Sequence, residues 1–196
     1  MKRILPTLLL AGGLMSAQAT IYQYNVTFAA EALGATGSGT GSVYYNNVSQ
    51  SLQMFADFSG LSGNVTVTHI HAPTAVPGAA TAGVALGNPS LPGFPLGATS
   101  GSYSNTINLT LAGSWNNTFL NNNGGTPAGA EAAFFTAMND GKAYWNIHSS
   151  TFTGGEIRGF LTLVPEPSSA ALVGLGITGV VLGRRNNRRA QESGRS

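Results

Sequence analysis

Apolar and polar residues alternate with a period of two along much of this chain, which is the pattern of strands with one buried and one exposed face. The clearest run covers residues 22–28. Comparable runs predict strands over residues 42–48, 51–58, 64–71, 106–111, 143–148 and 156–164, with a shorter one at 83–86. Glycine, serine and asparagine gather between several of these runs, as expected for turns. The pattern therefore predicts a chain built mainly of short strands.

One segment departs from this alternation and predicts a helix over residues 127–139. Thr126 can cap its first turn, Pro127 suits the first helical position, and Gly141 lies just past its end. The residues expected to form its buried stripe are Ala130, Phe134, Ala137 and Met138.

Many short strands and a single helix favour a mainly β fold, an antiparallel β-sandwich with one short helix. The polar residues 116–125 are then expected to form a loop, and so are the proline-, glycine- and alanine-rich residues 72–104, apart from the short strand at 83–86. Composition agrees, because the 196 residues include 27 glycines and 9 prolines but only 8% charged residues. The absence of cysteine excludes a disulfide scaffold, a cysteine-ligated zinc site and a thiol nucleophile.

The basic residues of the chain are concentrated at its two ends. The formal net charge is +2, yet residues 20–164 contain only Lys142 and Arg158 as basic residues. The same stretch contains the acidic residues Glu31, Asp57, Glu131, Asp140 and Glu156. This central part therefore carries a net charge of −3. A nucleic-acid partner would require the opposite sign and is not expected.

Residues 1–19 have the three parts of a secretory signal peptide. Lys2 and Arg3 form the charged start, and an apolar run continues from there to Met15. The small residues of the cleavage site are Ala17 and Ala19. Because the apolar run is too short for a membrane-spanning helix, we expect export by the secretion machinery and cleavage after Ala19.

A second targeting pattern follows the last predicted strand, at residues 165–189. It consists of Pro165, Glu166 and Pro167, an apolar run at 170–183, and the basic residues Arg184, Arg185, Arg188 and Arg189. A helix over 168–183 would be about 24 Å long, against about 30 Å for the hydrocarbon core of a bilayer. The pattern predicts a marginal transmembrane helix with a basic stop on its cytoplasmic side. Residues 190–196 are expected to be a disordered tail.

These three parts, in this order, resemble the PEP-CTERM sorting signal of bacterial exported proteins. The resemblance implies recognition by an exosortase-type transpeptidase, transient anchoring in the membrane and processing near Pro165-Glu166-Pro167. It also implies a cell-surface or extracellular location, in bacteria that make exopolysaccharide. A plain C-terminal anchor with a proline-rich stalk is the alternative, and both place residues 20–164 outside the cytoplasm.

Three short motifs within residues 20–164 resemble the CHRD (chordin) domain. They are His69-Ile70-His71-Ala72-Pro73, Tyr144-Trp145-Asn146-Ile147-His148 and Gly154-Gly155-Glu156-Ile157-Arg158-Gly159. The first motif departs from the family at Ala72, where glycine is common. The resemblance implies an extracellular β-rich module, and no general enzymatic activity comes with it. A growth-factor partner is not carried over to a bacterial protein.

The three histidines of the chain all lie in these motifs. His69 and His71 are two residues apart on a predicted strand, so their side chains project from one face, about 7 Å apart at Cα. His148 comes near the end of another predicted strand and can approach them. Glu156 is the carboxylate expected to join them, as a ligand or as an acceptor that orients a ring. The set predicts a zinc or copper site.

The histidines also have a purely structural interpretation, in which hydrogen bonds tie strand ends together and no metal binds. Val65 and Val67 are expected to share the face of His69 and His71, which favours a packed environment. Glu156 and Arg158 would then form an ion pair on their own strand.

Two functions remain open at this point. The first is a non-enzymatic exported CHRD-domain protein with a structural or adhesive role at the cell surface or in the extracellular matrix, linked to exopolysaccharide, with no cofactor. The alternative is an extracellular metal-binding protein or metal-dependent enzyme that uses His69, His71 and His148.

Overall fold

The computed structural model describes residues 19–165. Several predicted features lie outside these residues. They are most of the signal peptide with Ala17, the motif residues Glu166 and Pro167, the apolar C-terminal run, the basic stop and the tail at 190–196. Among the described residues, no helix has the length and apolar character needed to cross a membrane.

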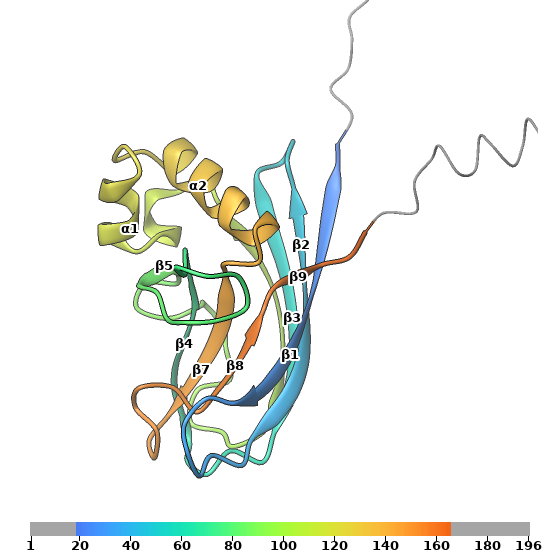
Figure 1. Cartoon of the computed structure of the whole chain (residues 1–196), viewed down its shortest axis with the longest axis vertical. Coiled ribbons are helices and arrows are strands. Elements are labelled where there is room, and N and C mark those ends of the chain that lie inside the picture. Colours follow the sequence, from blue (N-terminus) through green and yellow to red (C-terminus); the bar gives the residue numbers. More distant parts are fainter. Residues whose placement is uncertain (1–18, 166–196) are drawn as a thin grey trace, which may run out of the picture.

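Within the described residues the chain forms nine strands, two α-helices and one 3-10 turn at Ala112–Ser114 (Figure 1). The strands are β1 (Ile21–Ala30), β2 (Ser38–Asn46), β3 (Ser51–Ser59), β4 (Val65–His71), β5 (Val84–Leu86), β6 (Gly101–Asn108), β7 (Tyr144–Ser149), β8 (Ile157–Phe160) and β9 (Thr162–Leu163). The helices are α1 (Asn117–Asn122) and α2 (Pro127–Asn139).

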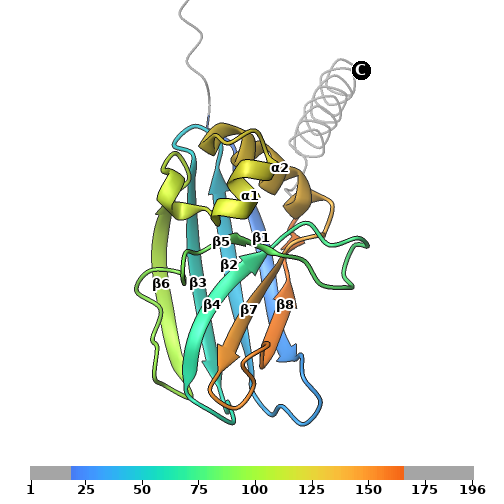
Figure 2. The ribbon, with the colours of Figure 1, turned by 90° about the vertical axis from the view of Figure 1, so that its left-hand side faces the viewer.

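All strand pairs are antiparallel, in the order β5-β4-β7-β8-β1-β2-β3-β6, with β9 also paired to β1. The long strand β1 pairs with β2 over most of its length and with β8 at Ala29 and Ala30. The sheet curls at this strand, so that β4, β7 and β8 lie across from β2, β3 and β6 (Figures 1 and 2). The predicted mainly β, antiparallel fold is confirmed, and its two layers are halves of one continuous sheet.

The core lies between these layers and is made by the inward side of the alternating pattern. Leu52, Met54, Ala56 and Phe58 of β3 are all buried, as their period of two predicts. Trp145 of β7 is fully buried, and its indole N–H donates to Thr68 Oγ1 at 2.8 Å. Hydrogen bonding of the indole removes the cost of burying its polar atom.

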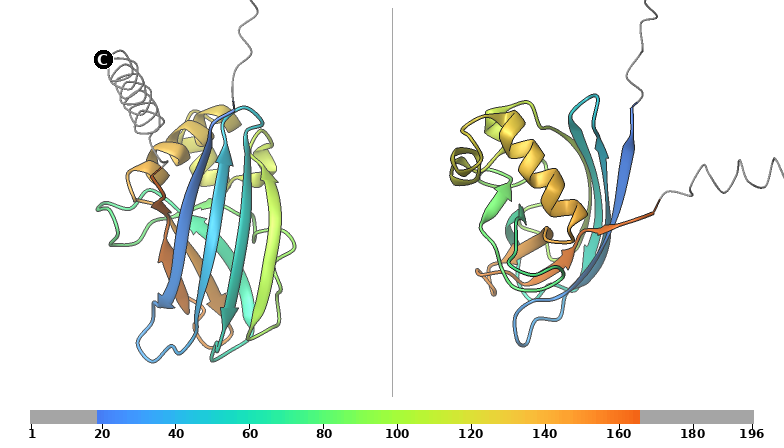
Figure 3. Two further views of the ribbon diagram at one scale, coloured as in Figure 1. Left: turned by 90° about the vertical axis from the view of Figure 1, so that its right-hand side faces the viewer. Right: turned by 45° about the horizontal axis from the view of Figure 1, so that its top comes forward.

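Helix α2 has the predicted bounds, and its predicted stripe of Ala130, Phe134, Ala137 and Met138 is buried. Thr126 caps it, since its side chain accepts a hydrogen bond from the Gly129 N–H. The helix also buries Glu131, which the sequence pattern does not predict. Its carboxylate accepts hydrogen bonds from the Tyr45 hydroxyl at 2.8 Å and the Gln50 amide at 2.6 Å. The helices lie over one end of the curled sheet (Figure 3, right).

Three predicted boundaries are wrong. Helix α1 forms inside the predicted loop 116–125, because the Asn116 side chain accepts from the N–H groups of Thr118 and Phe119 and caps its first turn. Strand β6 begins at Gly101, within the predicted loop 72–104, and ends at Asn108. The predicted strand 106–111 therefore runs too far, and Leu111 is 55% exposed.

A bulge in β4 places Val65 on the opposite face of the sheet from Val67, His69 and His71. The pairing with β7 shifts register between Val65 and Val67, which adds one residue to β4 at this point. As a result, Val65 and Thr68 are both buried, while Val67 shares the outward face with the histidines. The prediction that Val65 packs beside His69 and His71 is wrong.

Candidate metal centre

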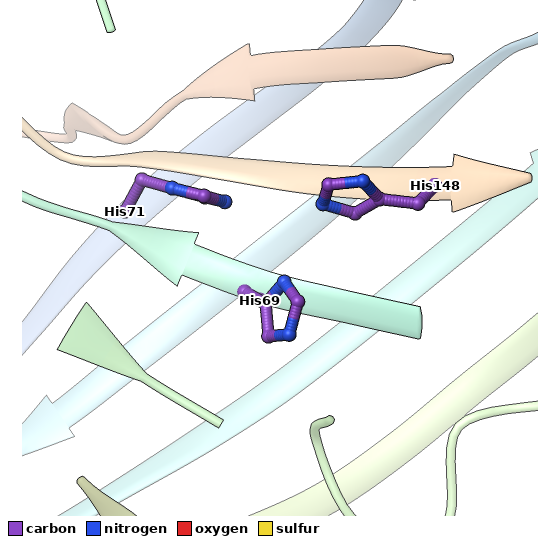
Figure 4. A group of neighbouring side chains, drawn as sticks. All are labelled: His69, His71 and His148. Carbon is purple, nitrogen blue, oxygen red and sulfur yellow. The ribbon is translucent and has the colours of Figure 1, made fainter. Parts of the chain in front are cut away.

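The structure brings all three histidines together on the outward face of strands β4 and β7 (Figure 4). The two strands are neighbours, with His69 opposite Asn146, His71 opposite Tyr144, and His148 opposite Val67. One ring nitrogen from each histidine lies within 4.8 Å of the other two. An ion placed midway between three nitrogens at this spacing would be at most about 2.8 Å from each of them. Small movements of the rings would shorten these distances to the 2.0–2.1 Å of a zinc–imidazole bond.

Each imidazole is held in place by a backbone carbonyl. His69 Nε2 lies 2.6 Å from the Pro89 oxygen, His71 Nδ1 lies 2.9 Å from the Ala82 oxygen, and His148 Nδ1 lies 2.8 Å from the Thr153 oxygen. A carbonyl oxygen only accepts hydrogen bonds, so each of these ring nitrogens carries the proton. In a neutral ring the other nitrogen then presents a lone pair, and the hydrogen bond fixes the orientation of the ring.

The three remaining nitrogens are the ones that have no partner. Within residues 19–165, His69 Nδ1, His71 Nε2 and His148 Nε2 are shielded from solvent and make no hydrogen bond. Buried polar atoms in proteins are normally paired, because leaving one unpaired costs about 1–3 kcal/mol. Three unpaired lone pairs that share one small space match the donor set of a metal ion with imidazole ligands.

The surroundings of the rings keep two of them neutral. Burial lowers the pKa of His71 to about 4, although its hydrogen bond to the Ala82 carbonyl acts in the opposite direction. Burial also lowers the pKa of His69. The His71 ring stacks on Tyr144, with ring centroids 4.8 Å apart. Metal ions bind the neutral form of imidazole, so this environment favours binding near neutral pH.

The carboxylate next to this cluster is Glu31, and it was not predicted. It accepts a hydrogen bond from the Asn146 side-chain amide and lies 3.3 Å from the Arg158 guanidinium. The pKa of Glu31 is raised by burial, and Arg158 and His148 act against this rise. Gly155 makes the arrangement possible, since a Cβ there would collide with the Asn146 and Glu31 side chains.

Glu156 lies away from the three histidines. Its side chain is fully buried, and one carboxylate oxygen accepts a hydrogen bond from the Ser62 N–H at 2.5 Å. Among the described residues, the group able to share a metal ion consists of the three histidines without Glu156. The predicted ion pair between Glu156 and Arg158 is wrong, because Arg158 pairs with Glu31.

Acidic conditions are expected to destabilise the metal-free protein through His71. Its pKa of about 4 lies below the ordinary value of 6.5, so the unfolded chain takes up a proton first as the pH falls. The stabilisation is complete above pH 6.5 and is lost towards pH 4, by an amount on the order of 2 kcal/mol given the partial exposure of the ring. Urea unfolding at several pH values measures this loss.

The matched control for this prediction is His71→Gln, which has no titrating group at this position. The wild-type protein should lose more stability than the variant between pH 7 and pH 4.5. Glu31 titrates in both proteins, so its effect cancels in the comparison. Identical pH dependence in the two proteins would contradict the assigned role of His71.

Comparison with known protein families identifies the domain. The model of the CHRD domain matches residues 18–161, and the chain belongs to this family. The three motifs of the resemblance converge on the outward face just described, where they supply the histidines, Tyr144, Asn146 and Arg158. Comparisons with curated proteins and with solved structures found no match.

The model of the PEP-CTERM protein-sorting motif matches residues 163–189. Together the two matches define an exported protein that an exosortase sorts to the cell envelope or surface. Of the Pro-Glu-Pro motif, the structure describes Pro165, which follows β9 and Val164. The Val164 N–H donates a hydrogen bond to the Gln23 carbonyl and so ties the end of the domain to β1.

Proposed function

We propose that this chain is an exported metal-binding protein whose CHRD domain holds one zinc or copper ion at His69, His71 and His148. Two observations carry the proposal: each histidine has one buried ring nitrogen without a partner among the described residues, and one ring nitrogen from each lies within 4.8 Å of the other two. The three backbone carbonyls that hold the opposite nitrogens support it, because they orient the lone pairs before any metal arrives.

We also propose that the site binds its ion without catalysing a reaction. The ligand nitrogens are shielded from solvent, which is unlike a catalytic site with an open position for substrate. Glu31 is engaged by Asn146 and Arg158, so it is not a free base beside the metal. These contacts favour a bound ion that joins β4 to β7.

Metal content of the purified full-length protein tests the proposal. Wild-type protein exposed to zinc or copper and then desalted should retain close to one ion per chain. His69→Gln/His71→Gln and the single variant His148→Gln should each lose it, because they remove ligands from different strands. Glu156→Gln is the control and should keep the ion. Metal retained by both histidine variants would rule the site out.

A second candidate function is a structural or adhesive role, with exopolysaccharide as the partner expected from the sequence. A specific surface favours it. The outward face of β1, β2, β3 and β6 carries hydroxyl and amide side chains and very little charge. This face lies on the half of the sheet that does not carry the histidines, so both functions are compatible in one domain.

A further inference from the structure

The outward face of β1, β2, β3 and β6 is a broad array of uncharged polar side chains. The strand registers place them in rows across the sheet: Gln23, Tyr44, Gln53 and Thr106; then Asn25, Ser42, Phe55 and Ser104; then Thr27, Thr40, Asp57 and Ser102. The left view of Figure 3 shows these strands side by side, and no described helix covers them. As far as residues 19–165 are concerned, the face is open to a partner.

The charge on this face restricts what that partner is. Among the residues of the three rows, Asp57 is the single charged one, and the Ser102 hydroxyl donates a hydrogen bond to it. The rows contain no lysine or arginine, which a nucleic acid, an acidic polysaccharide or an anionic membrane would require. A neutral partner with many hydrogen-bonding groups matches the face best.

Two aromatic rings lie in the middle of the array. Tyr44 and Phe55 are on neighbouring strands, with ring centroids 6.1 Å apart and planes at 82°. Both lie on the side of the sheet away from the core, where they remain partly exposed to solvent. Aromatic side chains in such positions offer an apolar surface next to hydrogen-bonding groups. A sugar ring matches such a surface, because its C–H groups form an apolar face and its hydroxyl groups, around the edge, make hydrogen bonds.

The spacing of the array is regular in both directions. Neighbouring strands lie about 4.8 Å apart, and successive outward residues of one strand lie about 6.7 Å apart. We propose that this face binds a neutral polysaccharide, whose C–H faces contact Tyr44 and Phe55 and whose hydroxyl groups bond to the surrounding side chains. The inference rests on the adhesive role proposed above, and it does not involve the histidine cluster.

Retention of the full-length protein, purified in mild detergent, on insoluble polysaccharides tests this inference. The probes are microcrystalline cellulose and chitin, which are neutral, and an alginate gel, which is polyanionic. The wild-type protein should bind a neutral probe and pass through alginate. Tyr44→Ala/Phe55→Ala should lower retention at least tenfold. Gln53→Glu/Thr106→Glu should also lower retention at least tenfold, because it adds negative charge to the face without removing the aromatic rings. Leu33→Ala, in the exposed loop after β1, is the matched control.

The possible outcomes separate this inference from the metal site. The inference is supported if a chelator leaves polysaccharide binding unchanged and the Tyr44/Phe55 and Gln53/Thr106 variants lower it. Binding that a chelator abolishes and the face variants leave intact would assign it to the histidines and overturn the inference. Retention on alginate alone, or on no probe, would also overturn it. So would sedimentation showing self-association that depends on Tyr44 and Phe55, since the occupant would then be a second copy of the chain.

Discussion

Zinc or copper(II) is expected to raise the thermal unfolding midpoint of this protein by roughly 10 °C when the free metal exceeds its dissociation constant a thousandfold. At that ratio a ligand specific for the folded state stabilises it by about 4 kcal/mol, and one kcal/mol shifts the midpoint of a domain of this size by about 2–4 °C. Such binding is expected to be specific for the folded state, because β4 and β7 bring together His69 and His148, which are far apart in the chain.

Calorimetric scans with and without metal measure this shift. His148→Gln should lose most of it, because two histidines on one strand leave half of a tetrahedral zinc site unfilled. The variant should unfold near the temperature of the metal-free wild-type protein, and a chelator should return the wild type to that temperature. An equal shift in His148→Gln would mean that the ions bind elsewhere, and the account of the site would fail.

Gly159→Ala is expected to destabilise the domain by roughly 3 kcal/mol, the upper part of the range for added atoms in a packed interior. Gly159 lies on β8 opposite Trp145. A Cβ there would place Val26 Cγ1 and the backbone of Thr27 within 2.8 Å, and backbone atoms cannot rotate away. The substitution therefore separates β8 from β1 at the strand where the sheet curls.

Gly154→Ala is the matched control within the same motif. A Cβ at Gly154 would meet no atom within 4 Å, so this variant should unfold at nearly the same urea concentration as the wild type. Urea titration of both variants gives the difference in unfolding free energy. If both were equally stable, β8 would not pack against β1 as described.

Local sequence signals were sufficient for several elements of the fold. Helix α2 follows from Thr126 and Pro127, because the cap and the first helical residue are encoded next to each other. Helix α1 has apolar residues only at Phe119 and Leu120, which is too short a stripe to show helical periodicity. The bulge in β4 changes register by one residue, and the alternation of apolar residues around Val65 does not reveal it.

The histidine cluster was partly predictable from local sequence signals. The spacing of His69 and His71 places them on one face of any strand, and the structure adds His148 from the neighbouring strand. The carbonyls of Pro89 and Ala82 are 20 and 11 residues from the histidines they orient, whereas that of Thr153 is only 5 residues from His148. Any residue type supplies a carbonyl, so the sequence carries no signal for these contacts. Glu31 and Arg158 are far apart in the sequence, and they meet because β8 pairs with the end of β1.

X-ray absorption at the metal edge tests the three-histidine site most directly, since it reports the ligand atoms around the ion. For the zinc-loaded wild-type protein we expect three imidazole nitrogens at about 2.0–2.1 Å and no sulfur ligand. His148→Gln should show fewer imidazoles or no bound zinc. A coordination shell made mainly of oxygen, unchanged in His148→Gln, would contradict the assignment and leave the histidines as hydrogen-bonded links between loops and strands.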